Sequence, residues 1–277
     1  MTRRPVELPA VAARALDGRP APGGRGVLTV ILLLTLGWTA FQVDWGDAVP
    51  RTGGLGVLRS LLGGIVRPDL SSETLSRAVE ATWLTIVYAV AGLTLALALG
   101  LPLGVMASGA IAPPRVRRAS MVVGRGVLAA MRAVHELVWA WLFVVAVGLS
   151  PAAAVLAIGI PYGGILGRIY ADLLNDLPEA PLRALRVAGA GRIEALAYGR
   201  VPMTLPDLVA YTFYRFECAL RASAIMGFVG LGGLGFEIQI ALADLDYRQV
   251  GTYLAALVLL IAAVEAWSAL VRNEVAR

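Results

Sequence analysis

Long runs without a charged residue constrain this chain more than any other feature. Residues 81–114 contain no Asp, Glu, Lys or Arg, and residues 137–167 and 27–43 contain none either. An apolar helix of about 20 residues is long enough to cross the roughly 30 Å hydrocarbon layer of a bilayer. Only 16% of all residues are charged, whereas about 25% is usual in a water-soluble domain. The sequence therefore predicts an all-α, polytopic membrane protein.

We expect about six transmembrane helices, because Pro, Gly and charged residues interrupt the apolar runs at regular places. They are predicted at residues 27–43, 79–106, 120–148, 152–174, 204–228 and 250–271. The first run resembles a secretory signal in position. It is longer than the usual signal core, however, and no small-residue cleavage site follows it, so an uncleaved anchor is favoured.

The distribution of Arg predicts the orientation, because cytoplasmic loops retain basic side chains. If the N-terminus is inside, the segments assigned to the cytoplasm hold most of the Arg residues outside the spans. Both termini are therefore expected in the cytoplasm. The predicted regions are a flexible cytoplasmic tail (1–26), an N-terminal transmembrane anchor (27–43), an external segment (44–78), a membrane core (79–271) and a cytoplasmic C-terminus (272–277).

The residue inventory excludes several kinds of chemistry. All 24 basic residues are Arg, so the chain has no lysine for a phosphate-binding P-loop or a Schiff base. His135 and Cys218 are the only residues of their types, which is too few for a zinc site, an iron–sulfur site or an internal disulfide. We expect no catalytic site, metal site or cofactor in this chain. Nucleic-acid binding is not indicated, because the Arg residues punctuate apolar runs.

A cytoplasmic loop after the fourth predicted span, residues 175–203, is too apolar for a solvated linker. Its first half is expected to form a helix that starts at Pro178, Glu179 and Pro181 and breaks at Gly189 and Gly191. A second short helix, residues 192–198, is expected to end near Pro202. A helix–Gly–helix unit with an apolar face needs a soluble partner to cover it.

The same loop resembles the coupling loop of binding-protein-dependent ABC importer permeases. That pattern is Glu-Ala-Ala, three residues, Gly, nine residues, Ile, one residue, Leu-Pro. Three positions depart from it: Arg183 stands in place of Glu, Leu185 in place of the second Ala, and Gly199 in place of Ile. Glu179, one helical turn earlier, is the acidic residue that offers a substitute. The matching positions are Ala184, Gly189, Val201 and Pro202.

Two further stretches are similar to phosphonate-type ABC importer permeases, so that the resemblance covers residues 79–271. One is the segment 132–140, where His135 stands in place of the family's Pro. The other contains Tyr214, Arg215, Phe216, Glu217 and Arg221, followed by Met226, Gly227, Phe228, Val229, Gly230, Gly232, Gly233 and Gly235.

This resemblance implies a permease subunit of an importer in the bacterial cytoplasmic (inner) membrane that moves a phosphorus oxyanion, such as phosphonate, phosphite or phosphate. It implies two ATP-binding cassette subunits that carry ATP and Mg, a second permease copy, and a substrate-binding protein that is periplasmic or a lipoprotein. Two alternatives stay open: a type I permease for an amino acid or osmoprotectant, and a non-transporting membrane scaffold or sensor.

Charged residues within the spans are the candidates for the translocation path. An unpaired charge costs at least about 2.5–3.5 kcal/mol at the bilayer centre, so Arg215, Glu217 and Arg221 must face partners or a cavity. Glu217 and Arg221 are four residues apart, which favours a pair on one helical face. A guanidinium matches phosphorus oxyanions, which makes Arg215 or Arg221 a candidate for guiding the anion.

A second polar cluster lies in the third predicted span. We expect Arg132 and Glu136 to pair at i,i+4, with Glu136 also near the path, and His135 to be a hydrogen-bonded packing residue. The Gly-rich segment 227–235 is interpreted as an unwound helix end on the external side that lines the path, because a nucleotide-binding loop belongs in a soluble βαβ unit. Met226 and Phe228 are candidates for an apolar gate, with ordinary lipid or helix packing as the alternative.

Overall fold

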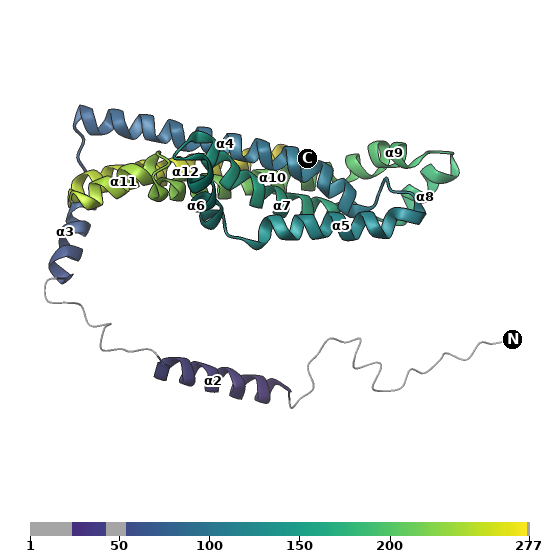
Figure 1. Cartoon of the computed structure of the whole chain (residues 1–277), viewed down its shortest axis with the longest axis horizontal. Helices are drawn as coiled ribbons and strands as arrows, with labels where there is room; N and C mark the ends of the chain where they lie inside the picture. Colours follow the sequence, from purple (N-terminus) through teal and green to yellow (C-terminus); the bar gives the residue numbers. More distant parts are fainter. Residues whose placement is uncertain (1–23, 43–53, 276–277) are drawn as a thin grey trace. The chain divides into compact units, whose positions relative to one another are not determined.

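The computed structural model describes residues 24–42 and 54–275 of the chain, and every regular element in these ranges is helical (Figure 1). The predicted all-α class is confirmed. The chain falls into two compact units, residues 1–57 and 58–277. In the first unit, α2 (Gly24–Gln42) covers the described part of the predicted anchor. Most of the predicted tail, residues 1–23, lies outside the described residues, as do residues 43–53 and 276–277.

Three helices of the second unit are long and apolar enough to cross a membrane alone: α4 (Ser72–Ser108), α7 (Pro151–Asn175) and α12 (Tyr247–Val275). Two bent helix pairs bring the candidate spans to as many as five among the described residues. The shorter apolar helices are α3 (Gly54–Val66) and residues 26–42 of α2. α4 begins at Ser72, inside the segment 44–78 that the sequence assigned to the external side.

The predicted third span, 120–148, is wrong as a continuous helix. It consists of α5 (Pro114–Ala133) and α6 (Glu136–Val147), which meet at an angle of 83°. Val134 is extended at the break, and His135 caps α6 because its Nδ1 accepts a hydrogen bond from the Leu137 amide at 3.3 Å. A capping residue followed by an acidic first turn starts a new helix even within an apolar run.

The second helix of the loop at residues 175–203 does not end at Pro202 as predicted. α9 (Arg192–Glu194) passes into a π-helical turn, η2 (Ala195–Arg200), and then into α10 (Val201–Met226), so that residues 192–229 behave as one helical segment. A Pro within a regular α-helix crowds the carbonyl four residues earlier. The wider turn immediately before Pro202 is the local adjustment that lets the helix continue.

The Gly-rich segment interrupts the helix, as predicted, but a further helix follows it. After η3 (Gly227–Val229), the backbone passes through Gly230, Gly232 and Gly233, all at positive φ between 82° and 88°, and re-enters the helical conformation in α11 (Leu234–Ala243). The two helical parts differ in direction by 40°. Glycine adopts positive φ without the steric penalty of a Cβ atom, which explains why the turn is so rich in it.

The core lies where α4 and α7 pack along their length, with α10 and α12 alongside (Figure 1). Gly100 and Gly104 of α4 face Gly163 and Gly167 of α7, and a Cβ atom on Gly104 would lie 2.9 Å from the Gly167 carbonyl oxygen. Small residues at i and i+4 let helix backbones approach closely in a bilayer. The α8–α9 loop and α11 lie at opposite ends of this bundle (Figure 1).

Candidate functional site

The loop at residues 175–203 contains the helix–Gly–helix unit that the sequence predicts. α8 (Glu179–Val187) begins directly after Pro178, and Gly189 at φ +92° terminates it. The amide of Gly189 donates to the Arg186 carbonyl at 3.1 Å, and that of Ala190 donates to the Leu185 carbonyl at 3.0 Å. These bonds satisfy the last carbonyls of the helix in the manner of a glycine C-cap, so that the chain turns back toward the membrane.

Two departures from the family pattern meet each other in space. A Cβ atom on Gly199 would lie 2.8 Å from Cδ1 of Leu185 and 3.0 Å from Cδ2 of Leu182, which is buried. Leu185, which stands in place of the family's Ala, therefore fills the space beside Gly199. The family has the larger Ile at the position of Gly199. The volume of the contact between α8 and η2 is conserved by exchanging the large residue across it.

Hydrogen bonds fix this loop to the membrane bundle. A guanidinium NH of Arg200 donates to the Leu174 carbonyl near the end of α7. The amide of Gly191 donates to Oε2 of Glu194 at 2.5 Å, which caps the start of α9. The first bond ties η2 to the end of α7, and the second lies within the loop.

The outer face of α8 is an apolar surface edged by charge. Ala180, Arg183, Ala184, Val187 and Ala188 line an open groove of about 560 Å³. The side chain of Val187 is 85% exposed. Arg183 and Glu179 form an exposed ion pair, with NH2 of Arg183 3.2 Å from Oε2 of Glu179. The carboxylate that the sequence suggests as a substitute for the family's Glu is therefore paired with Arg183, the residue that stands in place of that Glu. Ile193 and Tyr198 add further exposed apolar area.

Arg215 of α10 lies among three tyrosine rings. Its Cζ is 5.2 Å from the ring centre of Tyr162 on α7 and 5.6 Å from those of Tyr211 and Tyr214. Its NH2 group donates to the Tyr211 hydroxyl at 3.0 Å. Its Nε is buried without a hydrogen-bond partner. Within the described residues no carboxylate forms an ion pair with Arg215. We call these four residues the Arg215 cage.

The predicted pair of Glu217 with Arg221 is wrong. Glu217 Oε1 lies 2.6 Å from NH1 of Arg272, on α12, and that same nitrogen donates to Ser268 at 2.5 Å. Glu217 is almost completely buried against α12, so its partner comes from the neighbouring helix rather than from its own. Arg221 is exposed and forms no ion pair in the described part of the chain.

The other predicted path residues divide between the core and the surface. Met226 is completely buried in the main core cluster, whereas Phe228 is 47% exposed. The predicted pair of Arg132 and Glu136 is wrong, because the break at residues 134–135 separates them. Glu136 Oε2 instead lies 3.6 Å from Nε2 of His135.

Sequence reasoning missed Tyr162 and Arg272 as members of these sites. Tyr162 lies in an uncharged run, where its phenol is an uncommon polar group, and this was the available signal. Arg272 was assigned to the cytoplasmic C-terminus, and its contact with Glu217 joins residues too distant in the sequence for a spacing rule.

Comparison with known proteins gives consistent matches. Residues 100–273 match the family "Binding-protein-dependent transport system inner membrane component". The phosphite transport system permease protein PtxC of Stutzerimonas stutzeri is 32% identical over 82% of this chain and 81% of its own length. The phosphate-import permease protein PhnE of Mycolicibacterium smegmatis is 34% identical over 68% of this chain and 35% of its own length.

The fold is shared with a solved transporter. An inward-facing structure of the MetNI methionine ABC transporter has a TM-score of 0.65 to this chain, with 20% sequence identity, and the match covers 75% of this chain and all of the solved one. At this identity the likeness concerns the fold alone. From the extent of the family match and the identity to the curated permeases, we conclude that this chain is a multi-pass membrane protein that belongs to the binding-protein-dependent ABC importer permeases.

Proposed function

We propose that the chain is the permease subunit of an importer that moves a phosphorus oxyanion, of the phosphonate, phosphite or phosphate class, across the bacterial cytoplasmic membrane. One observation carries the proposal: the relatives at 32% and 34% identity are named for phosphite and for phosphate. The Arg215 cage supports it, because a guanidinium without an ion-pair partner among the described residues complements the charge and the oxygens of a phosphorus oxyanion.

The machine we propose has two copies of this chain, two cytoplasmic ATP-binding cassette subunits and one external substrate-binding protein. The groove on α8 and the exposed side chains beside it form the apolar surface on which each ATPase docks. ATP and Mg belong to the ATPases. Closure of the ATPases on ATP displaces α8, and the attached α10 moves with it to alternate the access of the path. Both termini of the permease are cytoplasmic.

Reconstitution tests this function. The permease, its ATPase and its binding protein are placed in liposomes, and uptake is measured for phosphite, phosphate and methylphosphonate, with methionine and glycine betaine as comparison solutes. We expect ATP-dependent uptake of at least one phosphorus oxyanion and of neither comparison solute. Uptake of a comparison solute alone supports the other type I permease. Failure of the chain to co-purify with any ATPase supports a scaffold.

A further inference from the structure

Arg215 is a cation within the spans that the described chain does not neutralise. Its guanidinium is surrounded by the rings of Tyr162, Tyr211 and Tyr214, and its Nε is buried without a hydrogen-bond partner. Aromatic faces attract a cation through their quadrupole but leave its charge intact. The cage therefore holds a positive charge in a low-dielectric setting without cancelling it.

The comparison with the neighbouring charge on α10 shows that this is not general to the helix. Glu217, two residues further on, has an ion pair at 2.6 Å from Arg272. The fold thus supplies a counter-ion, Arg272, to the carboxylate of Glu217, which is buried between α10 and α12. Around Arg215 it supplies tyrosines, and no carboxylate of the described residues forms an ion pair with the guanidinium.

The groups that surround the guanidinium are suited to oxyanion oxygens. The Tyr162 hydroxyl is engaged, because it donates to the Cys218 carbonyl at 3.1 Å. The Tyr211 hydroxyl accepts from Arg215 and has no acceptor for its own proton in the described chain, and the Tyr214 hydroxyl has no described partner. Two phenol donors and a guanidinium form charge-assisted hydrogen bonds with phosphorus-bound oxygens.

An open face of the bundle reaches the cage. Tyr214 is 48% exposed, and Arg221, Ile225 and Phe228 follow it at helical spacing as the exposed residues of the same face. Met226, between them, is buried. An anion that moves along this face meets Arg221 and then the Arg215 cage.

We infer that Arg215, held by Tyr162, Tyr211 and Tyr214, is an intramembrane binding site for the phosphorus oxyanion in transit. This inference rests on the proposed function. The binding protein delivers the anion, and the cage accepts it by replacing water around the anion with the guanidinium and two phenol hydroxyls. The anion binds this site transiently on its way across the membrane. Loss of the site therefore lets the ATPases hydrolyse ATP without import of the anion.

The test measures the number of oxyanions imported per ATP hydrolysed by the complete complex in liposomes. The variants are Arg215→Met, which keeps the length of the side chain but removes its charge, and Arg215→Lys. The control is Arg77→Met on α4, which removes a guanidinium from an exposed pair with Glu73 at 2.7 Å. We expect R215M to assemble and keep the ATPase rate that the loaded binding protein stimulates, while import per ATP falls at least tenfold. R215K restores part of the ratio, and R77M equals the wild type.

An R215M complex with an unchanged import ratio overturns the inference and leaves the proposed function intact. Equal loss of import and ATPase rate also overturns it, because this indicates a packing role. If R215M does not assemble, Tyr214→Phe decides, since it keeps the ring and removes only an unpartnered hydroxyl: a lowered ratio supports the site and an unchanged ratio overturns it. A wild-type complex that imports none of the three oxyanions overturns the proposed function and the inference together.

Discussion

At the scale of single residues, the departures of this chain from its family pattern are coupled rather than independent. Leu185 and Gly199 are far apart in the pattern but touch across the contact between α8 and η2. Sequence reasoning can list both as mismatches. It cannot see that one compensates for the other, because their proximity depends on the turn at Gly189 and on the unexpected π-helical turn.

This coupling predicts non-additive substitutions. Gly199→Ile should overpack the contact and cost about 1–3 kcal/mol, and Leu185→Ala should destabilise it by about 0.5–3 kcal/mol. The double variant should be more stable than the sum of the two effects by about 0.5–3 kcal/mol. The free energy of unfolding is measured for the purified wild type, the two single variants and the double variant. Co-purification of the ATPase is the second readout. Strict additivity would show that the two positions do not share a contact.

Asp69 gives a prediction about pH. It precedes α4 and accepts hydrogen bonds from Thr74 Oγ1 at 2.6 Å and Ser71 Oγ at 2.9 Å. These bonds, that of Thr74 first, lower the pKa of the carboxyl below its ordinary value, and Arg248 contributes to the same direction. A lowered folded-state pKa stabilises the fold fully above the unfolded pKa, and the stabilisation is lost as pH falls through the folded pKa.

The variant Asp69→Asn should therefore unfold at a lower temperature than the wild type at pH 7 and at pH 5. The difference should shrink only below about pH 3.9, the unfolded-state pKa of Asp. Thermal unfolding at pH 7, 5 and 3.5 measures it. Glu73→Gln, which alters an exposed carboxylate of α4, is the control. A difference that already disappears between pH 7 and 5 would contradict the assignment.

At the scale of elements, hydropathy located the helices but not their breaks. α7 matches the predicted span 152–174 within one residue at each end, because Pro151 and Ser150 mark its start. The break between α5 and α6 was missed because residues on both sides are apolar, and only the capping residue His135 signals it. The helix α11 was missed because a Gly-rich turn can end a helix or redirect it.

The geometry of that break predicts that His135→Pro is tolerated. His135 has φ −65° and Val134 is already extended at φ −109°, ψ 133°, which are the conformations that Pro and the residue before it require. We expect a change in unfolding free energy of about 1 kcal/mol or less, since rigidity offsets the lost cap. Val134→Pro, at an incompatible φ, should cost about 3 kcal/mol. Equal effects of both would contradict the described break.

The exposed face of α8 predicts where the ATPase binds. Val187→Glu places a charge at a side chain that is 85% exposed, so it should leave the permease folded but remove the ATPase from the purified complex. Val116→Glu is the matched control, because Val116 is exposed on the first turn of α5 outside the groove. Co-purification of the ATPase with both variants, or with neither, would contradict docking on this face.

At the scale of the whole molecule, the sequence predicted the class and family, whereas the pairing of charges depended on the tertiary fold. The sequence predicted Arg221, a cation on the same helix, as the partner of Glu217. In the structure its partner is Arg272 of α12. Likewise, the Arg215 cage needs Tyr162 from α7. Helical spacing identifies neighbours within one helix only, and the contacts between helices follow from packing along α4 and α7.

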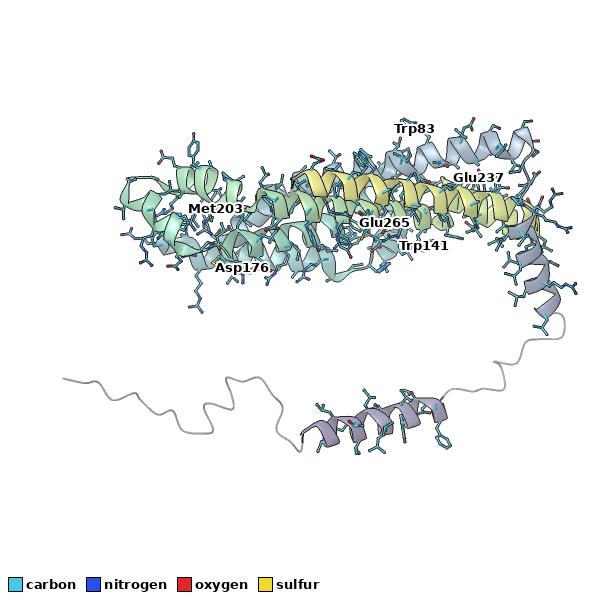
Figure 2. All side chains as sticks on the ribbon, turned by 180° about the vertical axis from the view of Figure 1, so that it is seen from behind. Trp83, Trp141, Asp176, Met203, Glu237 and Glu265 are labelled. Atoms are coloured by element: carbon cyan, nitrogen blue, oxygen red, sulfur yellow. The ribbon has the colours of Figure 1, made fainter. Side chains whose placement is uncertain are left out.

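An unpaired carboxylate predicts where a second copy packs. Glu265 is exposed on α12, with no ion pair or hydrogen bond in the described part of the chain (Figure 2). Exposure to lipid at this position is costly, so in the proposed dimer we expect protein to cover it. Glu265→Gln should weaken association of the two permeases by about tenfold, measured by intact-complex mass in mild detergent. Glu73→Gln should have no effect. Equal dimer populations would place Glu265 away from the interface.

The continuity of the helix from residue 192 to residue 229 has a mechanical consequence. Arg215 lies roughly 35 Å along this rod from the start of α9, and the π-helical turn is the one irregularity between them. In the proposed importer, a displacement of α9 therefore reaches the Arg215 cage through continuous helix, because no flexible loop lies between them to absorb it. This rigid connection couples the movement of the ATPase in time to the release of the anion.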